Sequence, residues 1–109
     1  MGGPGIGEFE ELVLLSILRL GSGAYGVPIL DEIRRRTGRD VLRPAVYVAL
    51  GRLENKGLVR SRSGDADDRR GGRPRKYYAV EPGGLEALSR SRSDLLSMWD
   101  GLESVLDGS

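Results

Sequence analysis

The N-terminal part of the chain contains an apolar segment with helical spacing. Between residues 8 and 20 the apolar side chains fall on more than one helical face: Phe9, Leu12, Val13, Leu14, Leu15, Ile17, Leu18 and Leu20. A helix that is apolar on two faces is covered on two sides. Because so small a protein offers few covering elements, we expect a partner subunit to contact this helix through Leu12 and Leu15. The glycine-rich residues 1–7 are predicted to be disordered.

Two more helices are predicted in the next forty residues. The second helix of the chain begins around Val27 and is closed by Gly38, and the third helix starts at Pro44 and runs to about Lys56. Gly57 ends the third helix as a left-handed cap. The buried faces are Ile29, Leu30 and Ile33 in the second helix and Val46, Leu50 and Leu53 in the third.

The hydrophobic period changes after the third helix. Residues 58–62 and 76–80 have the alternation of β-strands, and the polar, glycine-containing residues 63–74 separate them. This pattern predicts a β-hairpin with a long tip. Tyr77 and Tyr78 are neighbours on the second strand, so one faces the core and the other faces outward.

The last segment opens at Pro82 and has the seam of a coiled coil. With Arg92 in the one polar slot, spacings of three and four residues connect Leu85, Leu88, Leu95, Trp99, Leu102 and Leu106. A helix of that extent is roughly 33 Å long, which is more than so small a domain can cover. The pattern therefore predicts that residues 82–109 form a dimerisation helix, with Leu88, Leu95, Trp99, Leu102 and Leu106 against a second copy of the chain.

Together these elements predict a mainly α protein with a small β-hairpin. Three helices followed by a hairpin are the order of a winged helix-turn-helix, which we assign to residues 8–81. The long C-terminal helix is then added to this DNA-binding domain. We expect the third helix to enter the major groove and the basic hairpin, or wing, to reach phosphates or the minor groove.

Composition excludes several other classes of function. The 109 residues contain no Cys and no His, so we expect no metal, no cofactor and none of the common catalytic groups near neutral pH. The longest apolar run is far shorter than the roughly 20 residues that span a bilayer, and residues 1–7 do not resemble a signal peptide. We therefore expect a soluble cytoplasmic protein.

The net charge of +1 conceals an uneven distribution. Residues 34–76 contain 14 basic and 5 acidic side chains, a net of +9, whereas the two flanks together carry a net of −8. A basic middle segment is what a surface that faces a polyanion requires, although solvated loop charge is the ordinary alternative. The charge pattern therefore adds to the prediction of DNA binding.

The candidate DNA-binding residues come from the third helix and the wing. They are Arg43 at the start of the helix, Tyr47, Val48 and Arg52 on its outward face, and Arg69, Arg70, Arg73, Arg75 and Lys76 in the wing. Tyr47 could instead pack within the domain, and Arg52 could pair with Glu54 or Asp40. Three aspartates in residues 65–68 repel phosphate, so we expect contacts from Arg69 onward.

The same residues resemble the PadR-type transcriptional regulators. The resemblance rests on residues 8–20, on Ala24-Tyr25-Gly26-Val27, on Pro44-Ala45-Val46-Tyr47, on residues 50–59 and on residues 71–78. It implies a homodimeric repressor with an N-terminal winged helix and, as in the shorter branch of the family, one C-terminal dimerisation helix. It also implies that Tyr47 contacts the DNA backbone and that the residues just before it, Pro44 and Ala45, approach the bases.

Trp99 has two interpretations. It is a large apolar residue that fills the dimer core, or a pair of Trp99 side chains flanks a cavity for a flat, hydrophobic effector. Two other classes of function stay open at this point. One is a winged-helix module that binds proteins without binding DNA, and the other is an enzyme, for which the sequence offers no convergent polar constellation.

Overall fold

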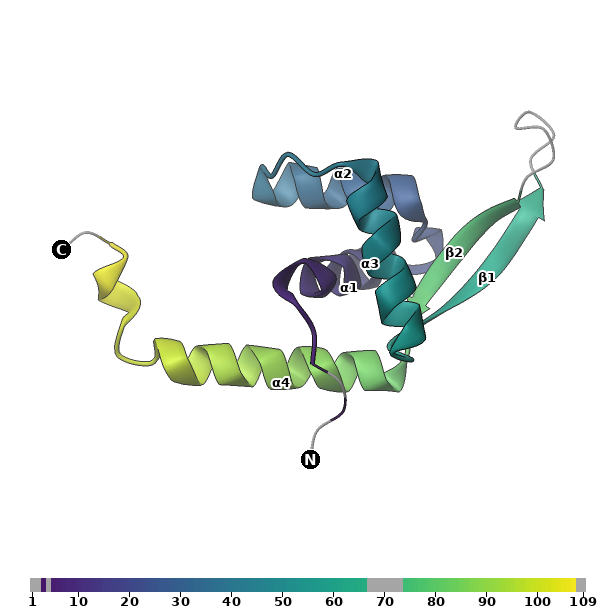
Figure 1. The fold of residues 1–109 in the computed structure, drawn as a ribbon. Coiled ribbons are helices and arrows are strands. Elements are labelled where there is room, and N and C mark those ends of the chain that lie inside the picture. Colours follow the sequence, from purple (N-terminus) through teal and green to yellow (C-terminus); the bar gives the residue numbers. More distant parts are fainter. Residues whose placement is uncertain (1–2, 4, 67–73, 108–109) are drawn as a thin grey trace.

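The computed structural model describes residues 3, 5–66 and 74–107. In chain order its elements are α1 (Glu8–Leu20), η1 (Gly21–Gly23), α2 (Gly26–Thr37), α3 (Arg43–Asn55), β1 (Val59–Ala66), β2 (Pro74–Val80), α4 (Pro82–Trp99) and η3 (Glu103–Val105). The strands pair as one antiparallel hairpin (Figure 1). The predicted fold class, a mainly helical chain with a winged helix-turn-helix, is confirmed.

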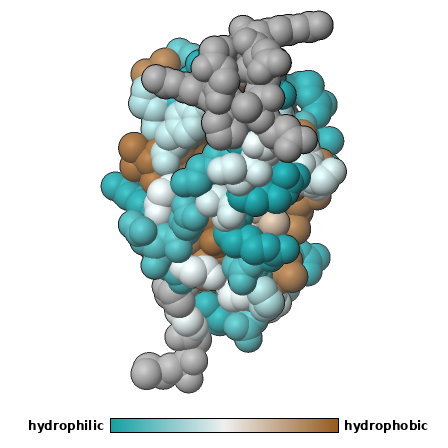
Figure 2. Space-filling view, turned by 90° about the vertical axis from the view of Figure 1, so that its right-hand side faces the viewer, coloured by the Kyte–Doolittle hydropathy of each residue, from teal (hydrophilic) through white to brown (hydrophobic). Residues whose placement is uncertain are grey.

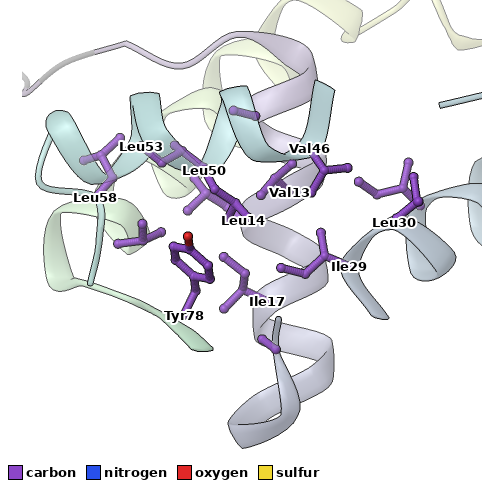
Figure 3. Close-up of a cluster of buried hydrophobic side chains, with 14 of the residues drawn as sticks. Val13, Leu14, Ile17, Ile29, Leu30, Val46, Leu50, Leu53, Leu58 and Tyr78 are labelled. Carbon is purple, nitrogen blue, oxygen red and sulfur yellow. The ribbon is translucent and has the colours of Figure 1, made fainter. Parts of the chain in front are cut away.

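The core lies where the first three helices and the root of the hairpin meet (Figure 3). Its largest fully buried side chains are Val13, Leu14, Ile29, Val46, Leu50 and Leu53. Tyr78 adds an aromatic ring from β2, and Leu58 closes the cluster below α3. The apolar faces predicted for the second and third helices are therefore the buried faces, as their three- and four-residue spacing requires.

Glycines in the left-handed conformation end two of these helices. Gly38 follows α2 with φ 70°, and its N–H donates to the carbonyl of Arg34. Gly57 follows α3 with φ 74° and donates to the carbonyl of Glu54. Both positions favour a residue without a Cβ atom, so the predicted helix ends are confirmed to within a residue or two.

The strands extend further into the hairpin than their alternation predicted. The ladder pairs Val59 with Val80 at its root and Ala66 with Pro74 at its outer end, with a shift of register between Ser63 and Ala66. Backbone pairing continues through polar residues because it does not depend on side-chain alternation. Tyr78 is buried and Tyr77 lies on the opposite face, as predicted.

Two predictions about the ends of the chain are wrong. The C-terminal helix stops at Trp99 and does not reach Leu106, because residues 100–102 turn the chain at Gly101, which has φ 84°. At the other end, residues 5–7 of the segment 1–7 lie against the domain: Lys56 Nζ donates to the carbonyl of Gly5, and Ile6 packs on the core. Residues 1, 2 and 4 lie outside the described residues.

A partly buried ion pair joins this N-terminal segment to α1 and α3. The ammonium of Lys56 donates to both carboxylate oxygens of Glu10, at 2.8 and 3.0 Å, and the N–H of Gly7 donates to Glu10 Oε1 at 2.8 Å. Burial by itself raises the pKa of Glu10, but the bonds from Lys56 and Gly7 outweigh it and hold the pKa below its ordinary value. Glu10 is therefore ionised at neutral pH.

Candidate nucleic-acid interface

The N-terminal half of α3 presents an exposed face to solvent. Arg43, Pro44 and Ala45 are exposed in its first turn, and Tyr47 and Val48 are 47% and 54% exposed one turn later. These are the residues that the sequence predicted for base and backbone contacts. They share a face because Val46, Ala49 and Leu50 occupy the opposite, buried side of the helix.

Tyr47 lies against the start of α2 as well as facing solvent. Its hydroxyl oxygen occupies the space where a Cβ atom on Gly26 would lie, with only 2.3 Å between the two positions. Gly26 therefore lets the ring approach the backbone of α2. Tyr47 thus packs within the domain and also faces solvent. The ring is positioned by packing, while about half of the side chain stays accessible.

Arg34 fixes the turn that leads into α3. Its Nε and Nη2 atoms donate to the carbonyl oxygen of Val41 at 3.0 and 2.6 Å. Two donors on one acceptor restrain the turn more than a single bond does. Sequence analysis counted Arg34 only among the basic residues of segment 34–76 and missed this role, because the contact depends on how the turn folds back.

Arg52 makes neither of the ion pairs considered for it. Within residues 5–66 and 74–107, Arg52 forms no ion pair with Glu54 or Asp40. Its positive charge helps to lower the pKa of Glu10. Glu54 instead accepts a hydrogen bond from Ser61 Oγ at 2.6 Å and lies 3.6 Å from Lys76 Nζ. The bond from Ser61 lowers the pKa of Glu54.

The described part of the wing contains two of its five predicted DNA-binding residues. Lys76 is exposed and lies near Glu54, whereas the Arg75 guanidinium stacks over the ring of Tyr25, 4.5 Å from its centroid. Arg69, Arg70 and Arg73 lie outside the described residues. Arg75 is therefore anchored to the domain, and Lys76 is the more accessible cation.

A stack of two tyrosines with an arginine at each end joins the hairpin to the turn before α2. The guanidinium of Arg62 lies 4.6 Å from the ring centroid of Tyr77, Tyr77 meets Tyr25 edge to face at 5.4 Å, and Arg75 covers Tyr25. The N–H of Tyr78 also donates to the carbonyl of Ala24 at 2.8 Å. We call the side chains of Arg62, Tyr77, Tyr25 and Arg75 the Arg–Tyr ladder. This ladder sets the direction of the wing relative to α2.

The predicted DNA-binding elements lie on one side of the molecule. In Figure 1 the start of α3 and the outer ends of β1 and β2 lie toward the top, and α4 runs along the bottom. The side that carries the hairpin is predominantly hydrophilic, with apolar residues in separate patches (Figure 2). A groove-binding helix and a basic wing on a common side are the arrangement that a winged helix needs to contact DNA.

A continuous apolar surface lies on the far side, between α1 and α4. Exposed side chains of both helices line a shallow groove there: Leu15, Leu18, Leu85, Leu95 and Leu96. Leu12 and Leu88 are partly buried against the core, and Trp99 is 40% exposed at the end of α4. Leu102 and Leu106 are exposed beyond the helix, and Leu96 is a surface residue that the predicted seam missed.

Hydrogen bonding fixes α4 to α1 along this surface. Ser91 Oγ donates to Glu11 Oε1 at 2.7 Å, and the only fully buried residues of α4 are Gly84 and Ala87. Gly84 lies so close to the backbone of Leu58 that a Cβ atom would be 2.4 Å from its carbonyl oxygen. The first half of α4 is therefore held by the helical domain, and the second half projects with its apolar residues uncovered. Within the described residues, no helix is long and apolar enough to cross a membrane.

Comparison with protein families matches residues 14–90 to the transcriptional regulator PadR-like family. Among solved structures, a PadR family regulator from Eggerthella lenta is 26% identical, with a TM-score of 0.70 over 94% of this chain and 88% of that one. One from Clostridium difficile is 25% identical, with a TM-score of 0.65 over 92% and 96%. A regulator from Clostridium thermocellum, at 22% identity and a TM-score of 0.70 over 87% and 89%, has the same fold. The comparison with curated proteins gave no match.

Proposed function

The chain belongs to the PadR-like family of transcriptional regulators, and from this we propose that it is a homodimeric repressor that binds a palindromic operator. Members of this family are DNA-binding regulators and not enzymes. The observation that carries the proposal is the position of the two contact elements. The start of α3 and the outer hairpin lie on one side, and α4 runs along the opposite side (Figure 1). The uncovered apolar surface consists of residues of α4 and α1.

Recognition of the operator is assigned to α3 and the wing. The residues that approach base edges in the major groove are Arg43, Pro44, Ala45 and Val48, and the Tyr47 hydroxyl donates a hydrogen bond to a phosphate. Lys76, together with the wing arginines Arg69, Arg70, Arg73 and Arg75, neutralises phosphates beside it. Arg52, exposed and without the two pairs considered for it, adds a further positive charge to the same helix.

The dimer is assigned to the apolar surface between α1 and α4. Five exposed leucines and the half-covered Trp99 form a contiguous patch, and such patches mark association surfaces. A two-fold axis through this surface places two copies of α3 one DNA turn, roughly 34 Å, or a multiple of it apart. A flat hydrophobic effector between paired Trp99 side chains stays a prediction, and titration of such compounds against Trp99 fluorescence tests it.

Selection of bound sequences from random DNA, followed by binding assays over a range of salt concentrations, tests this function. We expect an inverted repeat and an affinity that falls steeply with salt, because bound phosphates release counterions. Binding that shows no sequence preference and no salt dependence would contradict the proposal. It would favour the alternative of a winged helix that binds only proteins.

Single substitutions test the contact residues. Tyr47→Ala and Arg73→Ala are each expected to weaken operator binding by about tenfold or more, since each removes a hydrogen bond to a charged group. Arg90→Ala is the matched control, because Arg90 lies on α4, away from the start of α3 (Figure 1). Unchanged affinity in both test variants, with the fold retained by circular dichroism, would remove the assignment of these contacts.

A further inference from the structure

A groove of about 360 Å³ lies at the root of the wing, away from the exposed face of α3. Ile17 and Leu18 near the end of α1 form its apolar wall, and Gly21 and Ser22 form a second side. Leu18 borders both this groove and the apolar surface between α1 and α4. The hairpin closes it with a face on which Arg60, Arg62, Tyr77 and Ala79 occupy alternating positions of paired strands. This volume is within the range of small-molecule sites, at its lower end.

The charges of the groove are all of one sign. Of the described residues that line it, two are arginines and none is acidic. Arg60 is neutralised by an ion pair with Glu81, at the edge of the hairpin. The guanidinium of Arg62 lies over the Tyr77 ring and donates through Nη2 to the carbonyl of Ser22 at 3.3 Å. Since a guanidinium carries five N–H donors, Arg62 keeps donors for an anion in the groove.

We propose that this groove binds an amphipathic organic anion and that its occupancy regulates DNA binding through the wing. A carboxylate or sulfonate accepts hydrogen bonds from Arg62, and a flat apolar body lies between the Tyr77 ring and the side chains of Ile17 and Leu18. The apolar wall selects against inorganic anions and DNA phosphates, which have no apolar part to bury. The regulatory half of this proposal rests on the proposed function, whereas the binding half does not.

The Arg–Tyr ladder connects the groove to the wing. Arg62 is its first member, and an anion that draws the guanidinium toward the groove weakens the contact with the Tyr77 ring. Tyr77 in turn contacts Tyr25, which carries Arg75. Occupancy therefore changes the support of a strand that bears predicted DNA contacts. If the wing has two positions that the ligand binds with different affinity, the ligand changes the affinity for DNA by at most that ratio, and DNA changes the affinity for the ligand by the same factor.

Nuclear magnetic resonance with a fluorescent sulfonate locates the site. The full-length protein, labelled with ¹⁵N, is titrated with 8-anilinonaphthalene-1-sulfonate. We expect the largest amide shift changes at Gly21, Ser22 and residues 60–62 and 77–80. Changes that gather instead at Leu15, Leu88, Leu96 and Trp99 would place the probe on the apolar surface between α1 and α4, and the proposal would be wrong.

A matched pair of arginine variants tests the role of charge. Arg62→Gln is expected to weaken binding of the sulfonate by about tenfold or more, because it removes a charge-assisted hydrogen bond. Arg92→Gln removes the same charge from the surface between α1 and α4 and is expected to leave the affinity unchanged within about twofold. Equal losses in both variants would contradict a site at Arg62.

The regulatory half is measured separately on the selected DNA sequence. We expect the sulfonate to change the DNA dissociation constant by a factor of about 5 to 150, with sodium sulfate of equal ionic strength as control. The effect should be absent in Arg62→Gln. Binding in the groove without any change in DNA affinity would overturn the regulatory half. A protein that binds no DNA at all would overturn the proposed function, while the location of the probe would still decide the binding half.

Discussion

Gly26 is the residue that gives Tyr47 its place. The closest approach of the Tyr47 ring to α2 leaves no room for a Cβ atom, although Gly26 occupies a helical position where alanine has the higher propensity. The absence of a side chain at one residue thus orients the side chain assigned to a phosphate contact. A tyrosine at position 47 alone does not define this geometry.

We expect Gly26→Ala to weaken DNA binding about as much as Tyr47→Ala, because it displaces the tyrosine hydroxyl. In a Tyr47→Ala background the same substitution should cost no further affinity, which a double-mutant cycle measures. Gly23→Ala is the control, since a Cβ atom there meets nothing within 4 Å. Additive losses in the cycle would show that the two residues act independently.

Glu10 gives the protein a predictable response to acid. Because its pKa is lower in the folded protein than its ordinary value of 4.5, its contribution to stability is complete above that pH. The contribution is lost as the pH falls through the lowered folded pKa. Glu32 and Glu54, whose pKa values are also lowered, act in the same direction.

We therefore expect Glu10→Gln to reduce the free energy of unfolding by about 1–3 kcal/mol at pH 7, since it removes a charged acceptor from Lys56. The difference from the wild-type protein should shrink as the pH falls below about 4.5, and it should be smallest below the lowered pKa of the folded protein, where the wild-type carboxyl is neutral too. Urea unfolding at a series of pH values measures it. A difference that is independent of pH would contradict the assigned ionisation.

Among the elements, α4 departs most from its sequence pattern. The seam runs on to Leu106, but the helix ends at Trp99, so the last two seam residues lie outside α4: Leu102 precedes the short 3₁₀ helix Glu103–Val105 and Leu106 follows it. The dimer surface that we propose is correspondingly shorter. It extends from α1 to the end of α4 and needs no contribution from residues 100–107.

Alanine substitutions in α4 and beyond it test whether the dimer surface ends at Trp99 or continues into residues 100–107. We expect Leu95→Ala and Trp99→Ala to raise the dimer dissociation constant by about tenfold or more, as truncation of central interface residues does. Leu102→Ala and Leu106→Ala should change it by less than about twofold. Analytical ultracentrifugation measures all four. Large effects at Leu102 and Leu106 would mean that the helix continues in the dimer.

The elements that the sequence predicted well are those whose signal is local. The spacing of Val46, Leu50 and Leu53 defines a buried helical face without knowledge of what covers it, and Gly38 and Gly57 mark helix ends by their backbone conformation alone. The heptad pattern of the last helix records which side chains share a face. It does not reveal that the chain turns at Gly101.

The parts of the site that sequence reasoning missed depend on distant contacts. Tyr25 and Tyr77 are fifty residues apart, and Arg62 lies opposite Tyr77 only because of the strand register. The two hydrogen bonds from Arg34 to the carbonyl of Val41 also require the folded chain, and so does the space that Gly26 leaves for Tyr47. Residue type identified the candidate cations, but not which of them the domain already engages.

The whole molecule is elongated, with principal extents of 56 × 34 × 20 Å. Its core occupies the three-helix part, and the second half of α4 lies outside that core with apolar residues exposed. A single subunit therefore leaves apolar surface in water that association would bury. The elements proposed for DNA contact and the surface proposed for self-association are therefore on different sides of one small core.

If the subunits associate as proposed, the melting temperature should depend on protein concentration. Only the native dimer gains the burial at α1 and α4, so mass action raises the melting temperature as the protein is concentrated from about 1 to about 100 µM. Differential scanning calorimetry measures the shift. A constant melting temperature over this range, together with the mass of a monomer in light scattering, would rule out the dimer.

The residues that hold α3 in place are a different set from those it exposes. Val46, Leu50 and Leu53 fix the helix from below, and the guanidinium of Arg34 fixes the turn before it. Arg43, Ala45 and Val48 contribute little to either. Mutation can therefore change these three positions with little risk to folding. If they contact the operator as proposed, descendants of this protein can acquire new operators in single steps while the scaffold stays under its own separate selection.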